Sequence, residues 1–173
     1  MRASAFWKTV TIDRTDFLER LIGLLSEHDI RYCVVGGQAV NAYAEPLVSL
    51  DLDLAIALDH LPLIEALLRQ EFRVERFPHS LNVSDPGSDL RVQIQTDARY
   101  PAFVDRAIIH EVLGHRLPVA CLEDVLRGKV WAVMDDARRP SKRQKDLADI
   151  ARLLEAYPSL RDQVPSEVLS KLV

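Results

Sequence analysis

The stretch IRYCVVGGQAVNAYAEPLVSLDLDLAIAL, residues 30–58, decides the fold. Residues 30–35 are rich in β-branched and aromatic side chains and end at two glycines, which predicts a buried strand followed by a tight turn. The alanine-rich residues 38–44 favour a short helix, which Pro46 ends because the residue before a proline is pushed out of the α region. Residues 49–58 alternate leucine or isoleucine with aspartate or alanine, the period of a strand. The stretch therefore predicts a strand–helix–strand unit.

The segments on either side extend this unit into a larger layered structure. Apolar residues at three- and four-residue spacings predict helices, and short β-branched runs between turn-forming residues predict strands. An antiparallel hairpin through residues 84–88 is the economical connection between two of the strands. We expect helices at 13–28, 61–70, 122–134, 144–157 and 166–172, and strands at 72–77, 90–96 and 116–120. The predicted class is α/β (α+β): a small mixed β-sheet with flanking helices and a helical C-terminal part.

Composition excludes several classes of protein. With 173 residues, 48% hydrophobic and 28% charged, the chain can bury roughly 70% of its unfolded surface, which excludes a disordered or collagenous protein. The net charge of −4 argues against a protein that binds nucleic acid over its whole surface, but it is compatible with a local basic patch. Cys33 and Cys121 have neither metal-ligand spacing nor a disulfide framework. No signal peptide or membrane-spanning run is visible, so we expect a cytoplasmic protein with no membrane partner.

Asp51 and Asp53 are the first candidate functional residues. Residues two apart on a strand project from the same face about 6.5 Å apart, so both carboxylates can converge on a divalent cation. Burying two neighbouring negative charges without a cation would cost several kcal/mol. The alternative is an edge strand whose acidic face is simply solvated.

The glycine turn adds a second functional signal. A Gly36-Gly37 turn between a strand and a helix N-terminus lets a ligand approach the backbone and aims free N–H groups at an anion such as phosphate. The spacing is not the GxGxxG of dinucleotide-binding folds, and the turn alone is weak evidence. A phosphate seat followed by a metal-binding pair is, however, the layout that holds a magnesium–nucleoside triphosphate for nucleotidyl transfer.

The chain resembles the nucleotidyltransferase superfamily with the polymerase-beta-type fold, in particular AbiEii-type abortive-infection toxins and minimal nucleotidyltransferases. VVGGQA at 34–39 and SLDLDL at 49–54 are similar to the glycine motif and the Asp-x-Asp strand of that superfamily. GKVWAV at 128–133 and KDLADI at 145–150 are similar to its C-terminal signature. The matches span residues 30–155 in the family's order. On this basis we expect one nucleotidyltransferase-like domain over 1–173, with the sheet core at about 30–120 and the C-terminal helices at about 122–172.

The resemblance also implies roles for individual residues. Asp51 and Asp53 would be catalytic and bind Mg²⁺ or Mn²⁺, and Lys129 would be a third catalytic residue near the nucleotide. The nucleotide, an NTP substrate, would be contacted by Gly36, Gly37 and Ser49. Gln93, Lys145 and Asp146 would lie in the same cleft. An RNA or protein acceptor and an antitoxin partner are further implications of the resemblance.

Two positions depart from the family pattern. Family members carry an arginine four residues before the first aspartate of the pair, where this chain has Leu47. Active polymerase-type members carry a third carboxylate on the neighbouring strand, where this chain has Gln93. A neutral amide neither accepts a proton from an attacking hydroxyl nor holds a metal as firmly as a carboxylate. Asp89 and Asp97 share the strand parity of Gln93 but lie about 13 Å away along an extended strand.

The C-terminal part has further features with two interpretations. Five basic residues fall within positions 138–145, which favours contact with a triphosphate or with RNA phosphates, or else a solvated loop. Lys145 and Asp149 have the i,i+4 spacing of a helix ion pair. Trp7 and Trp131 are expected to be packing residues.

Three functional hypotheses follow. The first is a magnesium-dependent nucleotidyltransferase that modifies an RNA, protein or small-molecule hydroxyl, as the toxin of a toxin–antitoxin or phage-defence pair. The second is a catalytically degenerate member of the same fold that binds a nucleotide or a protein partner, a hypothesis motivated by Leu47 and Gln93. The third is a non-enzymatic α/β interaction module in which Asp51 and Asp53 are only a solvated face.

Overall fold

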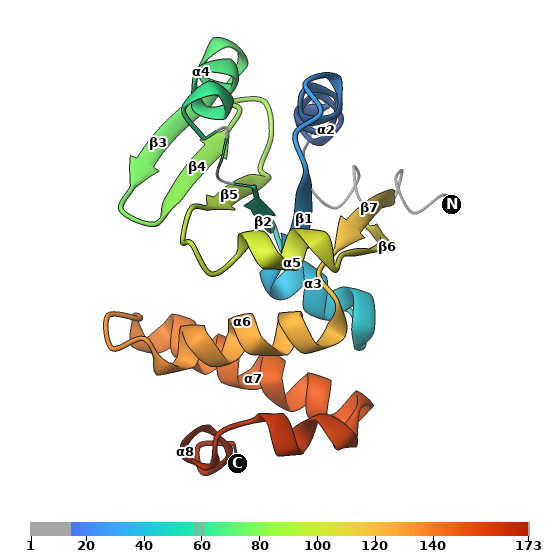
Figure 1. Ribbon diagram of the computed structural model, residues 1–173, viewed down its shortest axis with the longest axis vertical. Helices are drawn as coiled ribbons and strands as arrows, with labels where there is room; N and C mark the ends of the chain where they lie inside the picture. The colour runs from blue at the N-terminus through green and yellow to red at the C-terminus, as the bar shows by residue number, and fades with distance from the viewer. Residues whose placement is uncertain (1–14, 58, 60, 173) are drawn as a thin grey trace.

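The computed structural model describes residues 15–57, 59 and 61–172, and within them a single mixed sheet organises the chain (Figure 1). The sheet has seven strands in the order β3-β4-β5-β2-β1-β7-β6. Their bounds are β1 Tyr32–Val35, β2 Asp51–Ile56, β3 Arg73–Phe77, β4 Ser80–Ser84, β5 Arg91–Gln95, β6 Ile108–Val112 and β7 His115–Val119. The predicted mixed sheet with helices and a helical C-terminal part is confirmed.

The three central strands position the acidic pair. Strand β2 is antiparallel to β1, with Asp53 opposite Val35, the residue that precedes the glycine turn. On its other side β2 is parallel to β5, with Asp53 opposite Gln93. Residues in register on neighbouring strands project from the same face of a sheet. The end of β1, Asp53 and Gln93 therefore lie side by side.

The C-terminal helices form a second layer at one end of the sheet (Figure 1). The short helix α3 lies between the sheet and the C-terminal helices α6 and α7, and it packs against both of them. Helices α2 and α4 lie toward the opposite end of the molecule. The helix bounds are α2 Phe17–Glu27, α3 Gly36–Tyr43, α4 Leu61–Glu71, α5 Pro101–Asp105, α6 Leu122–Met134, α7 Pro140–Ala156, the 3-10 helix η2 Pro158–Gln163 and α8 Ser166–Leu169.

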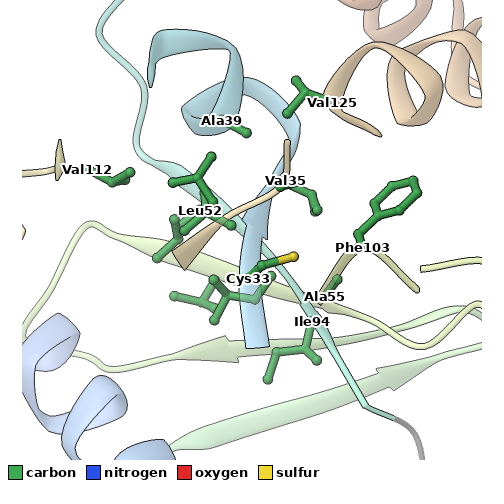
Figure 2. Close-up of a cluster of buried hydrophobic side chains, with 14 of the residues drawn as sticks. Cys33, Val35, Ala39, Leu52, Ala55, Ile94, Phe103, Val112 and Val125 are labelled. Carbon is green, nitrogen blue, oxygen red and sulfur yellow. The ribbon is translucent and has the colours of Figure 1, made fainter. Parts of the chain in front are cut away.

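The core joins the sheet to the helical layer (Figure 2). Cys33, Leu52 and Ile94 come from the three central strands and are at most 1% exposed. Phe103 of α5 and Val125 of α6 pack into the same cluster. Such burial contributes about 1.5–3 kcal/mol for each large apolar side chain, so this cluster fixes α6 over the end of the sheet that carries Asp53.

The structure differs from the sequence prediction mainly at short elements. The predicted hairpin between 72–77 and 90–96 is wrong, because β4 lies between these strands and pairs with both. Strand β4 is only five residues long and its alternating Leu81 and Val83 stand between two turn sequences. Strand β6, helix α5 and helix η2 were also not predicted. Helix α7 begins four residues before its predicted start.

Some expectations concern residues outside the described part of the chain. Trp7 and the first two residues of the predicted helix 13–28 lie outside the described residues. Within the described residues, no helix has both the length and the apolar character needed to cross a membrane.

Candidate functional site

Gly36 brings the backbone of the turn against the side chain of Asp53. It follows β1 directly and has φ +69°, in the left-handed region that favours glycine. A Cβ atom at Gly36 would lie 2.3 Å from Oδ2 of Asp53, a distance that no side chain tolerates. Gly37 is different, because a Cβ there would meet only Oδ2 of Asp149 at 4.0 Å. Of the two adjacent glycines, Gly36 is therefore the one that the local geometry requires.

This difference gives a matched pair of substitutions. Gly36→Ala is expected to lower the free energy of unfolding by about 2 kcal/mol, because the new methyl group is in a strained conformation and displaces Asp53. Gly37→Ala is expected to change it by less than about 1 kcal/mol, since alanine is favoured over glycine in a helix. Urea denaturation of the two variants measures the difference. Equal effects would contradict the assignment of the constraint to Gly36.

Asp53 is a partly buried carboxylate without an ion-pair partner among the residues that the structure describes. Burial raises its pKa to about 6, with a further contribution from the negative charge of Asp51, while the charges of Lys129 and Arg138 act in the opposite direction. A cation placed beside this carboxylate would therefore gain from a negative charge that the protein itself leaves uncompensated.

Asp51 and Ser49 lie beside Asp53 but have other contacts. The Asp51 carboxylate is 2.8 Å from Nε of Arg91, the residue opposite it on β5. The Ser49 hydroxyl accepts a hydrogen bond from the backbone N–H of Asp51, at 3.2 Å. The Ser49 carbonyl accepts another from the buried side chain of Gln38 at 3.1 Å. Ser49 thus fixes the start of β2 rather than facing the cavity described next.

A cavity of about 420 Å³ lies between the ends of the central strands and helix α6. Of the residues singled out in the sequence, its wall includes Gly36, Asp53, Gln93, Lys129 and Asp146. Four others are outside the wall: Gly37, Ser49, Asp51 and Lys145. Most of the candidate residues are therefore gathered around one cavity, although they come from five separate elements.

Lys129 is held in a buried ion cluster between α6 and α7. Its Nζ lies 2.9 Å from Oδ1 of Asp146 and 2.8 Å from Oδ2 of Asp149. Arg138 contacts the other oxygen of Asp146 at 2.8 Å, and Arg152 contacts the other oxygen of Asp149 at 2.9 Å. Burial alone would lower the pKa of Lys129, but the two carboxylates outweigh it and raise that pKa. Lys129 is therefore a fixed positive charge on the cavity wall.

The basic segment 138–145 divides into paired and exposed residues. Arg138 lines the cavity and pairs with Asp146, while Arg143 donates to the backbone carbonyl of Asp135 at 2.8 Å. Lys145 is exposed, and the predicted ion pair between Lys145 and Asp149 is wrong. Asp149 instead pairs with Lys129 and Arg152. The i,i+4 spacing could not reveal this, because a partner on α6 reaches the buried face of α7.

The sequence analysis missed one wall of the cavity. Arg99 and Tyr100 precede α5, and they line the cavity together with Trp131 of α6. Trp131 was expected to be a packing residue, and it does stack on Phe103 with ring centroids 5.4 Å apart. It is nevertheless only partly buried and carries the guanidinium of Arg99 over its ring. The loop 96–100 has no periodic pattern that would have signalled this arrangement.

The donor chemistry of the site fits a metal only together with a substrate. No group of three or more histidine, cysteine, aspartate or glutamate side chains in the described part of the chain is arranged to hold a metal ion. Asp51 and Asp53 provide two carboxylates, with the amide of Gln93 beside them. Mg²⁺ is commonly held by one or two carboxylates, with phosphate oxygens and water completing its six ligands. These residues therefore fit a metal bound with phosphates, rather than a closed protein cage.

Several solved structures have a fold similar to that of this chain. ANT(2'')-Ia, in complex with adenylyl-2''-tobramycin, matches with a TM-score of 0.61 and 12% identity over 91% of this chain and 98% of that one. The lincosamide antibiotic adenylyltransferase LnuA, lincomycin-bound, gives 0.51 and 12% over 80% and 97%. An antigenic nucleotidyltransferase-like protein from Paracoccidioides brasiliensis gives 0.52 and 21% over 86% and 82%. These likenesses show the nucleotidyltransferase-like fold.

Sequence comparison shows the family. No curated protein matches the chain at a significant level. The family described as nucleotidyl transferase AbiEii toxin, type IV TA system, matches residues 42–171, from α3 through the C-terminal helices. This match includes β2 with its two aspartates and the buried cluster around Lys129. Since it covers well over half of the chain, the chain belongs to the AbiEii family of nucleotidyl transferase toxins.

Proposed function

We propose that this protein transfers a nucleotide from a magnesium-bound NTP to a hydroxyl group of an acceptor. The observation that carries the proposal is Asp53: a partly buried carboxylate without an ion-pair partner among the described residues, lying against the bare backbone of Gly36 on the wall of the cavity. This is a place where a cation and a phosphate group can both be satisfied. Family membership supports the same activity.

Each element of the site would contribute to binding the NTP. Backbone N–H groups at the N-terminus of α3 are free to donate to phosphate oxygens, since the first turn of a helix leaves them without partners. Asp53 and Asp51 would hold the metal ion, which supplies charge stabilisation for the phosphates during transfer. Lys129 and Arg138 add fixed positive charge on the opposite wall. Buried charges of this kind stabilise a developing anion without reorganising.

The acceptor follows less directly from the geometry. ANT(2'')-Ia and LnuA carry names and bound molecules that describe transfer to antibiotics, whereas the AbiEii family is a toxin family. We favour a cellular acceptor, RNA or protein, over an antibiotic, because the family assignment rests on the sequence and the other two likenesses concern the fold. An antitoxin partner follows from the same assignment.

Binding of the NTP can be tested before any acceptor is known. Magnesium with NTP is expected to raise the melting temperature of the wild type, because a ligand that binds only the native state stabilises it by mass action. At a concentration one hundred times the dissociation constant, the gain is about 2.7 kcal/mol. The double variant Asp51→Asn with Asp53→Asn should lose this rise. A rise of equal size in the double variant would place the nucleotide elsewhere.

A second candidate function is nucleotide binding without turnover. It is favoured by Gln93, which is opposite Asp53 in register, and by Arg91, which pairs with Asp51 from the same strand. Neither side chain can accept a proton from an attacking hydroxyl at ordinary pH.

Gln93→Asp distinguishes the two candidates. The variant should gain a base and a metal ligand, and label incorporation from NTP should rise by about tenfold or more if the wild type is limited by the missing carboxylate. Asn82→Asp is the matched control for added charge, because Asn82 lies opposite Gln93 on β4 but is exposed and outside the cavity wall. If neither the wild type nor Gln93→Asp incorporates label while both still bind NTP, the result would favour binding without turnover.

A further inference from the structure

A planar, positively charged surface lies on the cavity wall formed by the loop before α5 and by helix α6. The guanidinium carbon of Arg99 is 4.5 Å from the centroid of the Trp131 ring. Trp131 is in turn stacked on Phe103 at 13° between ring planes, and the edge of Tyr100 meets it at 5.7 Å. Two aromatic neighbours thus fix the orientation of the indole beneath Arg99.

Asp97 fixes the guanidinium itself. One oxygen of Asp97 accepts from Nε of Arg99 at 3.1 Å, and the other accepts from a terminal nitrogen at 3.0 Å. The first oxygen also accepts from the backbone N–H of Arg99 at 2.9 Å. These hydrogen bonds lower the pKa of Asp97, so its carboxylate stays ionised and continues to hold the guanidinium of Arg99. A surface arginine without such partners would sample many rotamers.

The outer side of Arg99 remains open to the cavity. Its side chain is 53% exposed although it is paired and stacked, and both Arg99 and Asp97 line the cavity that contains Asp53. Burial raises the pKa of the Tyr100 phenol, and the charge of Asp53 raises it further, so the two groups share this space electrostatically. Asp97 and Arg99 follow the end of β5, whereas Asp53 belongs to β2 and Gly36 to α3. The guanidinium and the proposed phosphate site therefore come from different elements around the same cavity.

We propose that Arg99, backed by Trp131, is a stacking platform for a nucleobase. A guanidinium held in one plane stacks well on the face of a base, and base stacking tolerates any of the four bases because each has a π-face. The placement in the same cavity as the triphosphate rests on the proposed function, in which the phosphates of the NTP lie at Gly36 and Asp53. The base could belong to the NTP or to an RNA acceptor, since the chemistry is shared.

The platform can be tested without phosphates. Trp7→Phe leaves Trp131 as the single tryptophan, so its fluorescence reports directly on the platform. Free nucleosides are expected to quench this emission saturably, purines more strongly than pyrimidines. Arg99→Lys in the same background keeps the positive charge but loses the planar fork, and should weaken the quenching by roughly tenfold. Nucleosides that leave the emission unchanged, or that bind both proteins equally, would overturn the platform.

A phosphate ligand without a base separates this proposal from the proposed function. Tripolyphosphate with Mg²⁺ has no base, so its binding reports only on the seat at Gly36 and Asp53. Failure of the wild type to bind it would count against the proposed function and leave the nucleoside result standing. Arg99→Lys should bind tripolyphosphate as well as the wild type does. Asp97→Asn, which frees Arg99 without removing it, should resemble Arg99→Lys with nucleosides.

The source of the base is decided by comparing NTP with a single-stranded RNA of mixed sequence. Weaker binding of NTP to Arg99→Lys, with RNA binding unchanged, assigns the base to the donor. The reverse assigns it to the acceptor. Loss of affinity for either ligand supports the platform, and unchanged affinity for both overturns it. A melting temperature within a few degrees of the wild type would show that the variant is folded, as expected for an exposed side chain.

Discussion

Asp53→Asn is expected to stabilise the ligand-free protein, by about 3 kcal/mol at pH 7.5. Burial and Asp51 raise the pKa of the Asp53 carboxyl from 3.8 to about 6, so its ionisation costs the folded state free energy that it does not cost the unfolded chain. Asparagine has nearly the same shape and carries no charge. Asp53 would then be a functional residue that the protein retains although it lowers the stability of the folded state.

The pH dependence gives this prediction its sign. Between pH 4 and pH 6 the folded state holds a proton on Asp53 that the unfolded state has already released, so this group makes stability fall as pH rises through that range. The advantage of Asp53→Asn should be fully present above about pH 7 and absent below about pH 4. Urea denaturation across this range measures it, with the exposed Asp89→Asn as a control for loss of one charge. Equal or lower stability of Asp53→Asn at pH 7.5 would contradict the account.

Lys129→Met is expected to have the largest destabilising effect, about 3 kcal/mol. Lys129 is 7% exposed and lies between two carboxylates that are at most 3% exposed, Asp146 and Asp149. Removing the amine leaves each carboxylate with one arginine, but one buried oxygen of each carboxylate loses its partner. Breaking a buried pair by removing one partner is costly for this reason, whereas replacing all partners together is not.

Lys145→Met provides the matched control on the same pair of helices. Lys145 is exposed, so its replacement should change the free energy of unfolding by less than about 0.5 kcal/mol. Chemical denaturation of the two variants under one set of conditions tests the comparison. If both lysines could be replaced without loss, Lys129 would not be the centre of the α6–α7 interface.

The sequence predicted the part of the fold that depends on short-range patterns. The period-two alternation of 49–58 identified β2, and Pro46 marked the end of α3, because local backbone preferences set these elements. Helix α3 begins at Gly36, two residues before its predicted start, so the two glycines belong to the helix and not to a separate turn. Strand β4 was missed since its pairing with β3 and β5 is set by tertiary contacts, which no local pattern records.

The candidate site likewise has residues that could be predicted from local spacing and residues that only tertiary packing brings together. Asp53 and Gly36 could be proposed from spacing alone, and the structure places them in direct proximity. The partners of Lys129 could not, because Asp146 lies 17 residues away and meets it only when α6 and α7 pack together. Arg99 was overlooked for a similar reason, since its significance lies in a stack with Trp131 from a different element.

Label incorporation is the most direct test of the central claim. The wild type would be incubated with each α-labelled NTP, Mg²⁺ or Mn²⁺, and total RNA and protein extract, and products would be separated and scanned for label. Incorporation into a discrete RNA or protein is predicted, with a loss of about a hundredfold or more in Asp53→Asn under the same conditions. Incorporation that is equal in the wild type and in Asp53→Asn would contradict the claim, as would the absence of label from every acceptor with all four nucleotides.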